Sequence, residues 1–341
     1  MTSINKIIIS RTDSIGDVIL TLPVAGVLKK AHPQAEIVFL AKKYTREIVE
    51  SSENVDLFLD WDDIQNNEKS NQITKFKDIQ ADVIIHVFPV KEIAYLAKEA
   101  NIPIRIGTTG RLYHYFTCNK LIPVSRRRSD LHEAQLNLKL LSPIINKTDF
   151  SLNELPDYYG FKKIEPLNDS ILKLISKDKF NLVLHPKSKG SAREWGLKNF
   201  ARLIEILPKD NFEIFISGTK EEGELIKNDI LDKYPQVTDL TGKLTLKELI
   251  SFINEIDGLV AASTGPLHIA AALGKHALGI YPPIKPMHPG RWAPLGKNAD
   301  YFVIDKNCNK CRKLDKCECI ESIKPEDVKS KLVNFLHKNT Y

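Results

Sequence analysis

Short apolar runs alternate with amphipathic stretches along the first 141 residues. The apolar runs are rich in isoleucine, valine and leucine, and they predict buried strands at 7–10, 36–40, 55–59, 82–87 and 104–106. Most stretches between them have helical spacing, and a further helix is expected over 130–141, where Asp130 and Glu133 resemble a capping box. Strands that alternate with helices are typical of an α/β fold with a parallel sheet.

The alternation stops over 142–179, which contains three prolines, and then restarts. Further strands are predicted at 181–185, 213–217, 237–240, 258–262 and 277–281. Helices are predicted over 197–207, 220–233 and 325–337, with another opened by a capping box between Thr245 and Glu248. Two successive α/β units of similar size predict two Rossmann-like, doubly wound domains that face a central cleft. We place them at 1–160 and 161–324.

Composition sets few further limits. The chain has 341 residues, of which 43% are hydrophobic and 27% charged, as expected for a globular protein with two domains. The first residues run directly into a strand and have no signal-peptide pattern, and no apolar run approaches the ~20 residues of a bilayer span. We therefore expect a cytoplasmic protein that is at most peripherally attached to the inner membrane.

The segment Ser263–Gly274 carries the clearest chemical signal. It has the pattern of a strand end, a tight turn and a helix in which Thr264 is the N-cap, Pro266 lies in the first turn and Gly274 follows the last. Free amide groups around Gly265 and the positive end of the helix dipole would attract a diphosphate or a similar anion. The alternative is an ordinary turn between a strand and a helix.

Two common nucleotide-binding fingerprints are missing from the sequence. No two glycines are separated by a single residue, so the G-x-G-x-x-G pattern is absent, and no Gly-Lys pair has the upstream glycine of a Walker A loop. These absences disfavour a hydride-transfer enzyme and a P-loop NTPase.

The first predicted strand ends in a motif that contains two carboxylates. Gly16 permits a tight backbone there, and Asp17 stands where the next helix begins. A carboxylate at this position can accept a proton or orient a hydroxyl group, although an aspartate at a helix start is also a common N-cap. Asp13 could do the same work, and spacing alone does not choose between the two.

The loop after the strand 181–185 is rich in cations and hydroxyl groups. Lys187, Lys189 and Arg193 could neutralise a diphosphate, while Ser188 and Ser191 could donate hydrogen bonds to it. A solvated basic loop is the alternative. Its place at the carboxyl end of a strand favours a ligand site.

These motifs together resemble the heptosyltransferases of glycosyltransferase family 9. The resemblance spans nearly the whole chain and rests on four ordered motifs, at 11–23, 185–195, 239–246 and 263–268. The segment Asp130–Glu133 is also similar to the family's acceptor-domain pattern. The resemblance implies a GT-B architecture, with an N-terminal acceptor domain, a C-terminal nucleotide-sugar domain and a last helix, 325–338, that packs back on the first domain.

The resemblance also implies a reaction, which is inverting, metal-independent transfer of a sugar without a cofactor. The family usually moves heptose from ADP-heptose to the inner core of lipopolysaccharide. It places the catalytic base on Asp17. The implied donor-binding residues are Lys187, Ser188, Lys189, Arg193, Glu221, Glu222, Ser263, Thr264, Gly265 and His268. The expected acceptor-binding residues are Asp13, Gly16, Arg111, Arg126, Arg127, Arg128 and His132.

One position departs from the family pattern. Members commonly carry Asp immediately before Thr-Gly, and this chain has Ser263. If that Asp contacts the donor sugar, the serine removes a charge and weakens a hydrogen bond. The donor could then be another nucleotide sugar, and a non-catalytic nucleotide-sugar-binding protein is a further alternative.

Charge and cysteine content add two expectations. The formal net charge is +6, and Arg126–Arg128 lie in the domain expected to bind the acceptor, which suits an anionic glycolipid and no nucleic acid, although these could be solvated surface charges. Cys308, Cys311, Cys317 and Cys319 could hold a structural zinc, but their spacing differs from the usual paired knuckles. Reduced structural cysteines are the favoured interpretation.

Overall fold

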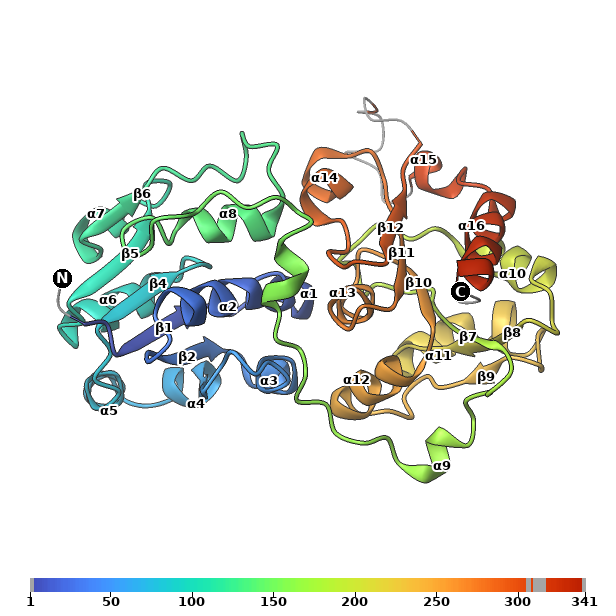
Figure 1. The fold of residues 1–341 in the computed structure, drawn as a ribbon, viewed down its shortest axis with the longest axis horizontal. Coiled ribbons are helices and arrows are strands. Elements are labelled where there is room, and N and C mark those ends of the chain that lie inside the picture. The colour runs from blue at the N-terminus through green and yellow to red at the C-terminus, as the bar shows by residue number, and fades with distance from the viewer. Residues whose placement is uncertain (1–2, 305–307, 309–316, 339–341) are drawn as a thin grey trace. The chain divides into compact units, whose positions relative to one another are not determined.

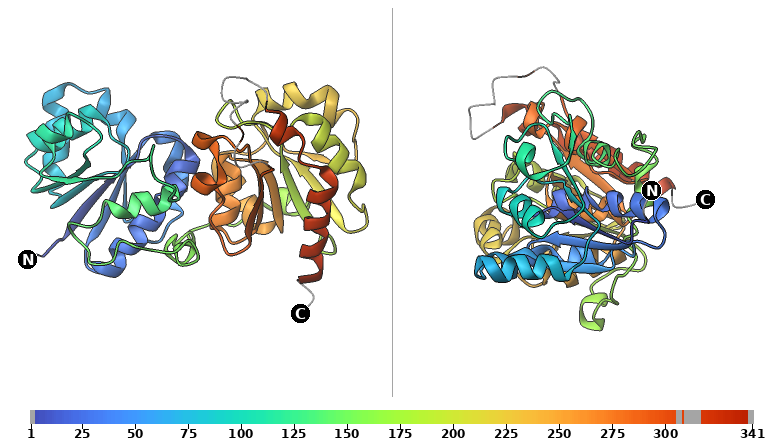
Figure 2. Two further views of the ribbon diagram at one scale, coloured as in Figure 1. Left: turned by 90° about the horizontal axis from the view of Figure 1, so that it is seen from above. Right: turned by 90° about the vertical axis from the view of Figure 1, so that its left-hand side faces the viewer.

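The computed structural model describes residues 3–304, 308 and 317–338. The chain divides into two compact units, Met1–Lys163 and Ile164–Tyr341, close to the predicted boundary after residue 160. Each unit contains a six-stranded sheet in which all paired strands are parallel. Helices cover both faces of each sheet (Figures 1 and 2). The α/β class and the doubly wound pattern within each unit are thus confirmed.

In unit 1 the sheet has the order β3-β2-β1-β4-β5-β6. Its strands are β1 (Lys6–Ser10), β2 (Glu36–Ala41), β3 (Leu57–Asp60), β4 (Val83–His86), β5 (Ile104–Thr108) and β6 (Lys120–Ile122). Its helices are α1 (Ile15–Ile19), α2 (Leu22–Ala31), η1 (Lys43–Thr45), α3 (Arg46–Glu50), α4 (Trp61–Gln65), α5 (Lys69–Asp78), α6 (Lys91–Glu99), α7 (His114–Thr117), α8 (Glu133–Lys139) and η2 (Leu155–Tyr158).

The sheet of unit 1 is buried on both faces because its central strands are almost entirely apolar. One face packs against α4, α5 and α6, where Ile8 and Ile84 meet Trp61 and Phe76 in one core cluster. The helix α2, which contacts β2 and α8, lies on the other face. Continuous apolar strands are what a sheet covered on both sides requires.

In unit 2 the sheet has the order β12-β11-β10-β7-β8-β9. Its strands are β7 (Phe180–His185), β8 (Phe212–Ile216), β9 (Thr238–Asp239), β10 (Gly258–Ala262), β11 (His276–Ile280) and β12 (Ala299–Phe302). Its helices are α9 (Asp169–Leu172), α10 (Leu197–Ile206), α11 (Lys220–Ile226), η3 (Lys227–Leu231), α12 (Leu246–Glu255), α13 (Gly265–Ala272), η4 (Lys285–Met287), α14 (Pro289–Trp292), α15 (Glu318–Glu321) and α16 (Pro325–Lys338).

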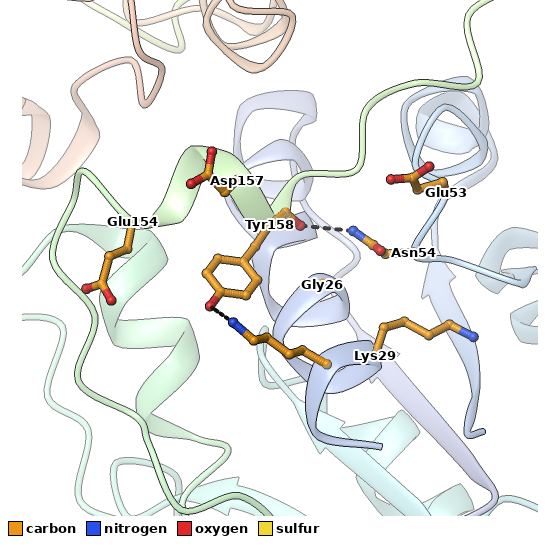
Figure 3. A pocket seen from close by; sticks show the side chains of 8 residues that line it. Gly26, Lys29, Glu53, Asn54, Glu154, Asp157 and Tyr158 are labelled. Atoms are coloured by element: carbon orange, nitrogen blue, oxygen red, sulfur yellow. Dashed lines mark hydrogen bonds between the residues drawn. The ribbon is translucent and has the colours of Figure 1, made fainter. Parts of the chain in front are cut away.

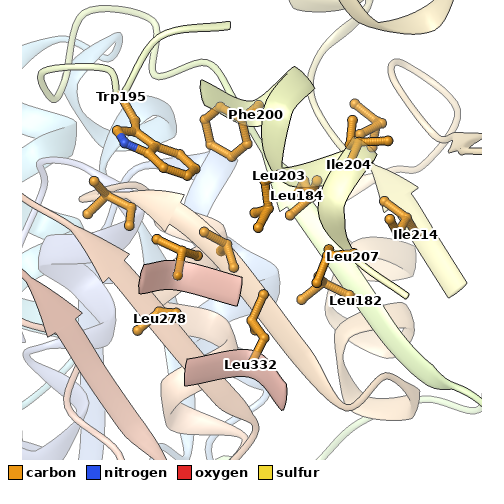
Figure 4. Packing of buried hydrophobic residues seen from close by; sticks show 14 of the residues in the cluster. Leu182, Leu184, Trp195, Phe200, Leu203, Ile204, Leu207, Ile214, Leu278 and Leu332 are labelled. Atoms are coloured by element: carbon orange, nitrogen blue, oxygen red, sulfur yellow. The ribbon is translucent and has the colours of Figure 1, made fainter. Parts of the chain in front are cut away.

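The largest core cluster of unit 2 joins the sheet to α10 and α16. Leu182, Leu184 and Leu278 of the sheet pack with Phe200 of α10 and Leu332 of α16 (Figure 4). On average, burying one such side chain contributes about 1.5–3 kcal/mol, so this cluster accounts for much of the stability of the unit.

The position of α16 corrects one prediction. The helix was expected to pack on the N-terminal domain, but Val328, Leu332 and Phe335 are buried in the core of unit 2. Phe335 also stacks on the His276 ring with 4.1 Å between the centroids. The apolar stripe of α16 is satisfied by α10 and the sheet, so the helix belongs to unit 2 (Figure 2).

The start of α8 corrects a second prediction. The expected capping box between Asp130 and Glu133 does not form, and α8 begins three residues later than the predicted helix. His132 is the N-cap: its Nδ1 accepts the Ala134 N–H at 3.3 Å, and its own backbone N–H donates to Gln135 Oε1 at 3.1 Å. The predicted capping box between Thr245 and Glu248 is confirmed. Thr264 is the N-cap of α13, as predicted, but its side chain makes no capping hydrogen bond.

Candidate active site

The strand order of each sheet reverses beside its first strand. In unit 1, β2 and β3 lie on one side of β1 and β4 to β6 on the other, and in unit 2, β7 and β10 form the same kind of boundary. In open α/β sheets, ligands bind outside the carboxyl ends of the strands at this switch point. The predicted motifs after β1, β7 and β10 all lie at these two switch points.

A buried guanidinium organises the switch point of unit 1. Arg11 directly follows β1 and its side chain is only 2% exposed. Its Nε donates to Asp13 Oδ1 at 2.6 Å, its Nη1 to Glu133 Oε1 at 3.0 Å, and its Nη2 to Asp17 Oδ1. Burial opposes the charge of Arg11, but these three carboxylates outweigh it and raise the pKa of Arg11.

The two candidate carboxylates differ in their surroundings. Asp17 lies in the first turn of α1 with an 18% exposed side chain, and its second oxygen accepts a bond from the Ser14 hydroxyl. Burial raises the pKa of Asp13 to about 6, and the charge of Asp17 adds to this effect while Arg11 opposes it. Arg11 therefore brings both carboxylates together, but burial leaves Asp13 more easily protonated than an ordinary aspartate.

Arg126 is built into the same network. Its Nε donates to Glu133 Oε1 at 2.8 Å, and its Nη2 donates to Val87 O at 2.9 Å and to Asn137 Oδ1 at 3.0 Å. Glu133 is thus a fully buried acid shared by Arg11 and Arg126. Arg126 fixes the loop after β6 to the end of β4 and to α8.

The other expected acceptor residues are dispersed. Gly16 lies inside α1, and His132 is a buried helix cap that is 1% exposed. Arg111, Arg127 and Arg128 are exposed and lie outside the Arg11 network.

The loop after β7 forms its own internal ion pair. Lys187 Nζ lies 2.5 Å from Glu194 Oε2, and the other oxygen of Glu194 accepts bonds from the Ser188 N–H at 3.1 Å and the Ser188 hydroxyl at 3.2 Å. Lys187 and Ser188 therefore already bind one carboxylate within the loop. Lys189 lies exposed at the loop tip with a left-handed φ of +48°, a conformation that few residues other than glycine adopt.

The end of this loop is anchored in the core. Trp195 is fully buried, and its indole N–H donates to Ile323 O at 2.8 Å. The Asn199 amide donates to the Trp195 carbonyl at 2.9 Å and to Glu321 O at 2.7 Å. Two bonds to the segment that precedes α16 thus position the loop that carries Arg193.

The start of α13 follows the neighbouring strand β10. The register pairs Ala261 of β10 with His185 of β7, so the turn at Thr264 and the loop after β7 leave the sheet side by side. Thr264 is 5% exposed, and its hydroxyl oxygen has no hydrogen-bond partner within the described residues. Gly265 opens the helix, and His268 is buried on its first turn. The first-turn amides and a buried hydroxyl are suited to an anion.

Ser263 interacts with a buried tyrosine. Tyr281 is fully buried at the end of β11, where its hydroxyl donates to Trp292 O at 2.5 Å and has a further side-chain bond to Ser263. Burial raises the pKa of Tyr281, and the bond from Ser263 partly opposes that effect. Ser263, which departs from the family pattern, therefore forms a hydrogen bond with a neutral hydroxyl group.

Glu222 and Glu221 have different environments. Glu222 is 5% exposed and closes a capping box, because its Oε2 accepts the Thr219 N–H at 2.8 Å. Glu221 is exposed, and a backbone hydrogen bond is the main cause that lowers its pKa. Of the two, the Glu221 carboxylate is the more accessible to a ligand.

The cysteine cluster lies partly outside the described residues, because Cys311 does. Among the residues that the structure describes, no group of three or more His, Cys, Asp or Glu side chains is arranged to hold a metal ion. Cys308, Cys317 and Cys319 contribute to or pack against the core cluster of unit 2, and zinc binding, the less favoured alternative, stays untested. No helix in the described ranges is both long and apolar enough to cross a bilayer.

A pocket of about 500 Å³ lies elsewhere in unit 1 (Figure 3). It is lined by Gly26, Lys29, Lys30, Glu53, Asn54, Glu154, Asp157 and Tyr158. Gly26 is required at this place, because a Cβ atom would lie 2.1 Å from the Tyr158 carbonyl oxygen. The pocket lies between α2, η2 and the segment with Glu53 and Asn54, and no predicted site residue lines it.

Comparison with known proteins now decides the family. The sequence model of glycosyltransferase family 9 (heptosyltransferase) matches residues 73–320, which is more than half of the chain. The chain belongs to glycosyltransferase family 9. The lipopolysaccharide core heptosyltransferase OpsX of Haemophilus influenzae is 22% identical to this family 9 protein over 314 residues, covering 86% of this chain and 83% of OpsX.

Two solved structures are similar to the family 9 chain over nearly its full length. The ADP-heptose lipopolysaccharide heptosyltransferase II of E. coli has a TM-score of 0.76 at 16% identity, covering 99% of this chain and 100% of that one. A family 9 glycosyltransferase from Veillonella parvula has a TM-score of 0.79 at 19% identity, with 98% of each chain covered. These likenesses confirm the GT-B fold.

Sequence reasoning missed three residues that shape the sites of this family 9 protein. Arg11 was predicted only as the first residue of the motif at 11–23. A charged residue directly after an apolar strand nevertheless indicates a buried partner of opposite charge. Glu194 directly follows the predicted site residue Arg193, and an acid within a basic loop was a readable signal. Tyr281 gave no sequence signal, because its contact with Ser263 comes from the neighbouring strand.

Proposed function

We propose that this protein transfers a heptose from ADP-heptose to an anionic acceptor in the inner core of lipopolysaccharide, with inversion at the anomeric carbon. Family membership supports sugar transfer, and the similar E. coli enzyme is an ADP-heptose lipopolysaccharide heptosyltransferase. The observation that carries the proposal is the carboxylate of Asp17, which is oriented at the switch point of unit 1 and partly exposed.

Asp17 acts as the general base in this proposal. In a single displacement, the acceptor hydroxyl attacks the anomeric carbon from the face opposite the nucleotide and loses its proton. Arg11 and Ser14 each donate to one oxygen of the Asp17 carboxylate, which fixes its orientation. Each oxygen keeps a further lone pair that can take the proton of the acceptor hydroxyl.

Unit 2 binds the nucleotide diphosphate. The first-turn amides of α13, the Thr264 hydroxyl and Arg193 supply donors and positive charge where negative charge develops on the leaving ADP. Such preorganised donors are each worth about 3–4 kcal/mol in transition-state stabilisation. With these cationic and amide groups in that role, the proposed reaction uses neither a metal nor a cofactor.

Asparagine variants at the two carboxylates test the assignment of the base. Asp17→Asn keeps the size of the side chain but removes the proton acceptor, and we expect kcat to fall about 10²–10⁴-fold with little change in ADP-heptose affinity. Asp13→Asn is the matched control, because Asp13 shares the same Arg11 partner, and we expect a smaller fall.

The pH dependence separates the two carboxylates further. If Asp13 were the base, kcat would decline below pH 6, where Asp13 becomes protonated, and Asp13→Asn would abolish turnover. Turnover of Asp17→Asn above one tenth of the unaltered enzyme would remove Asp17 as the base. Donor binding with no turnover by the unaltered protein would identify a non-catalytic binding protein.

A second candidate function is transfer of a different sugar. Ser263 stands where family members commonly carry Asp, and its bond to the neutral Tyr281 hydroxyl leaves this position without a charge. Thermal-shift measurements with ADP-heptose, UDP-sugars and GDP-sugars decide between the donors, because only a bound donor stabilises the folded protein. Selective stabilisation by a UDP-sugar or a GDP-sugar would replace ADP-heptose in the proposal.

The proposed substrates also suggest where the protein acts. ADP-heptose is water-soluble, whereas the proposed acceptor is a membrane glycolipid. We therefore place the enzyme in the cytoplasm, with peripheral attachment to the inner face of the cytoplasmic membrane and no nucleic-acid partner.

A further inference from the structure

The helical turn at α7 exposes an apolar face. Leu112 is 76% exposed, Phe116 63% and Tyr115 54%. They are spaced i, i+3 and i+4, and the backbone bonds from Tyr115 N–H to Leu112 O and from Phe116 N–H to Tyr113 O place them on consecutive helical turns. Residues at this spacing share one face of a helix.

The opposite face of the same turn is already buried. His114, Thr117 and Cys118 have the same spacing, and each is at most 8% exposed. The face that meets the protein thus carries polar groups, while the face that meets the surroundings carries two aromatic rings and a leucine. A helix on a soluble surface normally has the reverse arrangement.

Hydrogen bonds from the carboxyl end and the buried face of α7 attach the helix to the sheet. Arg105 of β5 donates from Nε to Thr117 O at 2.7 Å and from Nη1 to Ile102 O at 2.5 Å, which satisfies the carboxyl end of α7. The His114 ring bonds to the backbone of Thr108. These bonds hold α7 against β5, the strand next to the edge strand β6 (Figure 1).

The chain segment that carries this face has charges of one sign. Between Glu99 and Asp130 the sequence contains six Lys and Arg residues and no Asp or Glu. Arg111 and Lys120 flank α7, and both are exposed. Beyond β6, Arg128 borders an apolar pocket of about 390 Å³ that is lined by Ile122, Pro123, Val124, Leu131 and Leu136 among others.

We propose that this surface, which we define as Arg111, Leu112, Tyr115, Phe116 and Lys120, docks on an anionic lipid bilayer. Exposed aromatic and aliphatic side chains that enter the interface, surrounded by cations that attract acidic headgroups, are the requirements for such docking. A second copy of the chain is a poorer occupant, because two such cationic faces would repel each other. The inference deepens the proposed function, since it names the surface that meets the membrane of the acceptor.

Flotation with lipid vesicles tests the docking. The full chain is expected to bind vesicles that contain phosphatidylglycerol and to bind weakly to vesicles of phosphatidylcholine alone. Leu112→Ser combined with Phe116→Ser should lower the partition coefficient at least about tenfold, because it removes most of the inserted apolar area. Lys120→Glu should lower it about fivefold in dilute salt and less at 0.5 M salt.

A matched control separates this surface from general hydrophobicity. Leu225 in unit 2 is 66% exposed, and Leu225→Ser should leave vesicle binding unchanged. Equal binding by the Leu112→Ser, Phe116→Ser variant and the unaltered protein would overturn the proposal, as would a change of that variant's molar mass in solution, which would identify a protein interface.

Enzyme assays keep this test distinct from that of the proposed function. Transfer to a lipid-free, water-soluble acceptor should be the same in the unaltered protein and in the Leu112→Ser, Phe116→Ser variant. If neither protein transfers heptose but the vesicle results hold, the proposed function fails and the docking surface stands. If both transfer heptose and neither binds vesicles, the docking surface fails alone.

Discussion

Acidification should destabilise unit 1 through His86. This residue ends β4, is fully buried, and neither of its ring nitrogens has a hydrogen-bond partner within the described residues. Burial lowers the pKa of His86 to about 3, and the nearby His114 and Arg105 contribute to the same direction. In an unfolded chain, histidine has a pKa of about 6.5.

The size of the effect follows from these two pKa values. The folded state keeps His86 neutral, so the unfolded chain binds one more proton as the pH falls below about 6.5. Each pH unit then costs about 1.4 kcal/mol of unfolding free energy, which amounts to ~2 kcal/mol between pH 7 and pH 5. The unfolding free energy that unit 1 keeps while His86 is neutral in both states is fully present above pH 6.5. It is lost progressively as the pH falls to the folded-state pKa of about 3.

Tryptophan fluorescence can report unit 1 alone. The chain has three tryptophans, and Trp61 is the one in unit 1, where it is 3% exposed in the core. In a background with Trp195→Phe and Trp292→Phe, urea unfolding followed through Trp61 gives the free energy of unfolding at pH 7, 6 and 5. His86→Leu in the same background removes the titrating group.

The pH dependence of the unfolding free energy is compared between the proteins with histidine and with leucine at position 86. We expect the free energy of unfolding to fall between pH 7 and pH 5 by about 2 kcal/mol more with His86 present than with leucine at this position. Titrating groups that do not interact with His86 contribute equally to both proteins. Parallel pH curves for the two would refute the reasoning, because His86 would then be protonated equally in the folded and unfolded states.

Two substitutions test other features. Gly26→Ala should destabilise unit 1 by about 1–3 kcal/mol in urea unfolding, because its Cβ would meet the Tyr158 carbonyl oxygen at 2.1 Å; Gly110→Ala, where the nearest atom is 3.7 Å away, should change little, and equal effects would contradict this. Glu194→Gln should tighten ADP binding roughly fivefold in calorimetry, because it releases Lys187 and removes a negative charge worth about 1 kcal/mol; an unchanged or weaker affinity would indicate that Glu194 supports the loop.

The central strands could be predicted because they are buried on both faces. The strand 258–262 was predicted with its observed bounds. A short uninterrupted apolar run is typical of a strand in a sheet that is covered on both faces. The edge strands β6 and β12 were missed, because each is short and partly exposed and therefore lacks such a run. The start of α8 was misplaced because Asp130 is of a residue type that commonly caps helices, whereas the folded backbone uses His132 as the cap.

The location of the sites could also be predicted, but not their internal bonds. Ligand motifs at strand ends follow from the α/β pattern, and the topology places them at the switch points. Arg11 and Glu133 are 122 positions apart in sequence, so their ion pair depends on the packing of α8 beside β1. The same holds for Ser263 and Tyr281, whose bond joins the ends of two neighbouring strands.

The bond between Trp195 and Ile323 links the proposed donor loop to the carboxyl-terminal part of the chain. Their separation of 128 positions means that cleavage or early termination before Ile323 would remove the acceptor of the buried indole N–H. It would also remove α16 from the core that supports α10. A shortened chain would therefore lose ADP affinity even though every residue proposed to touch the nucleotide is still present.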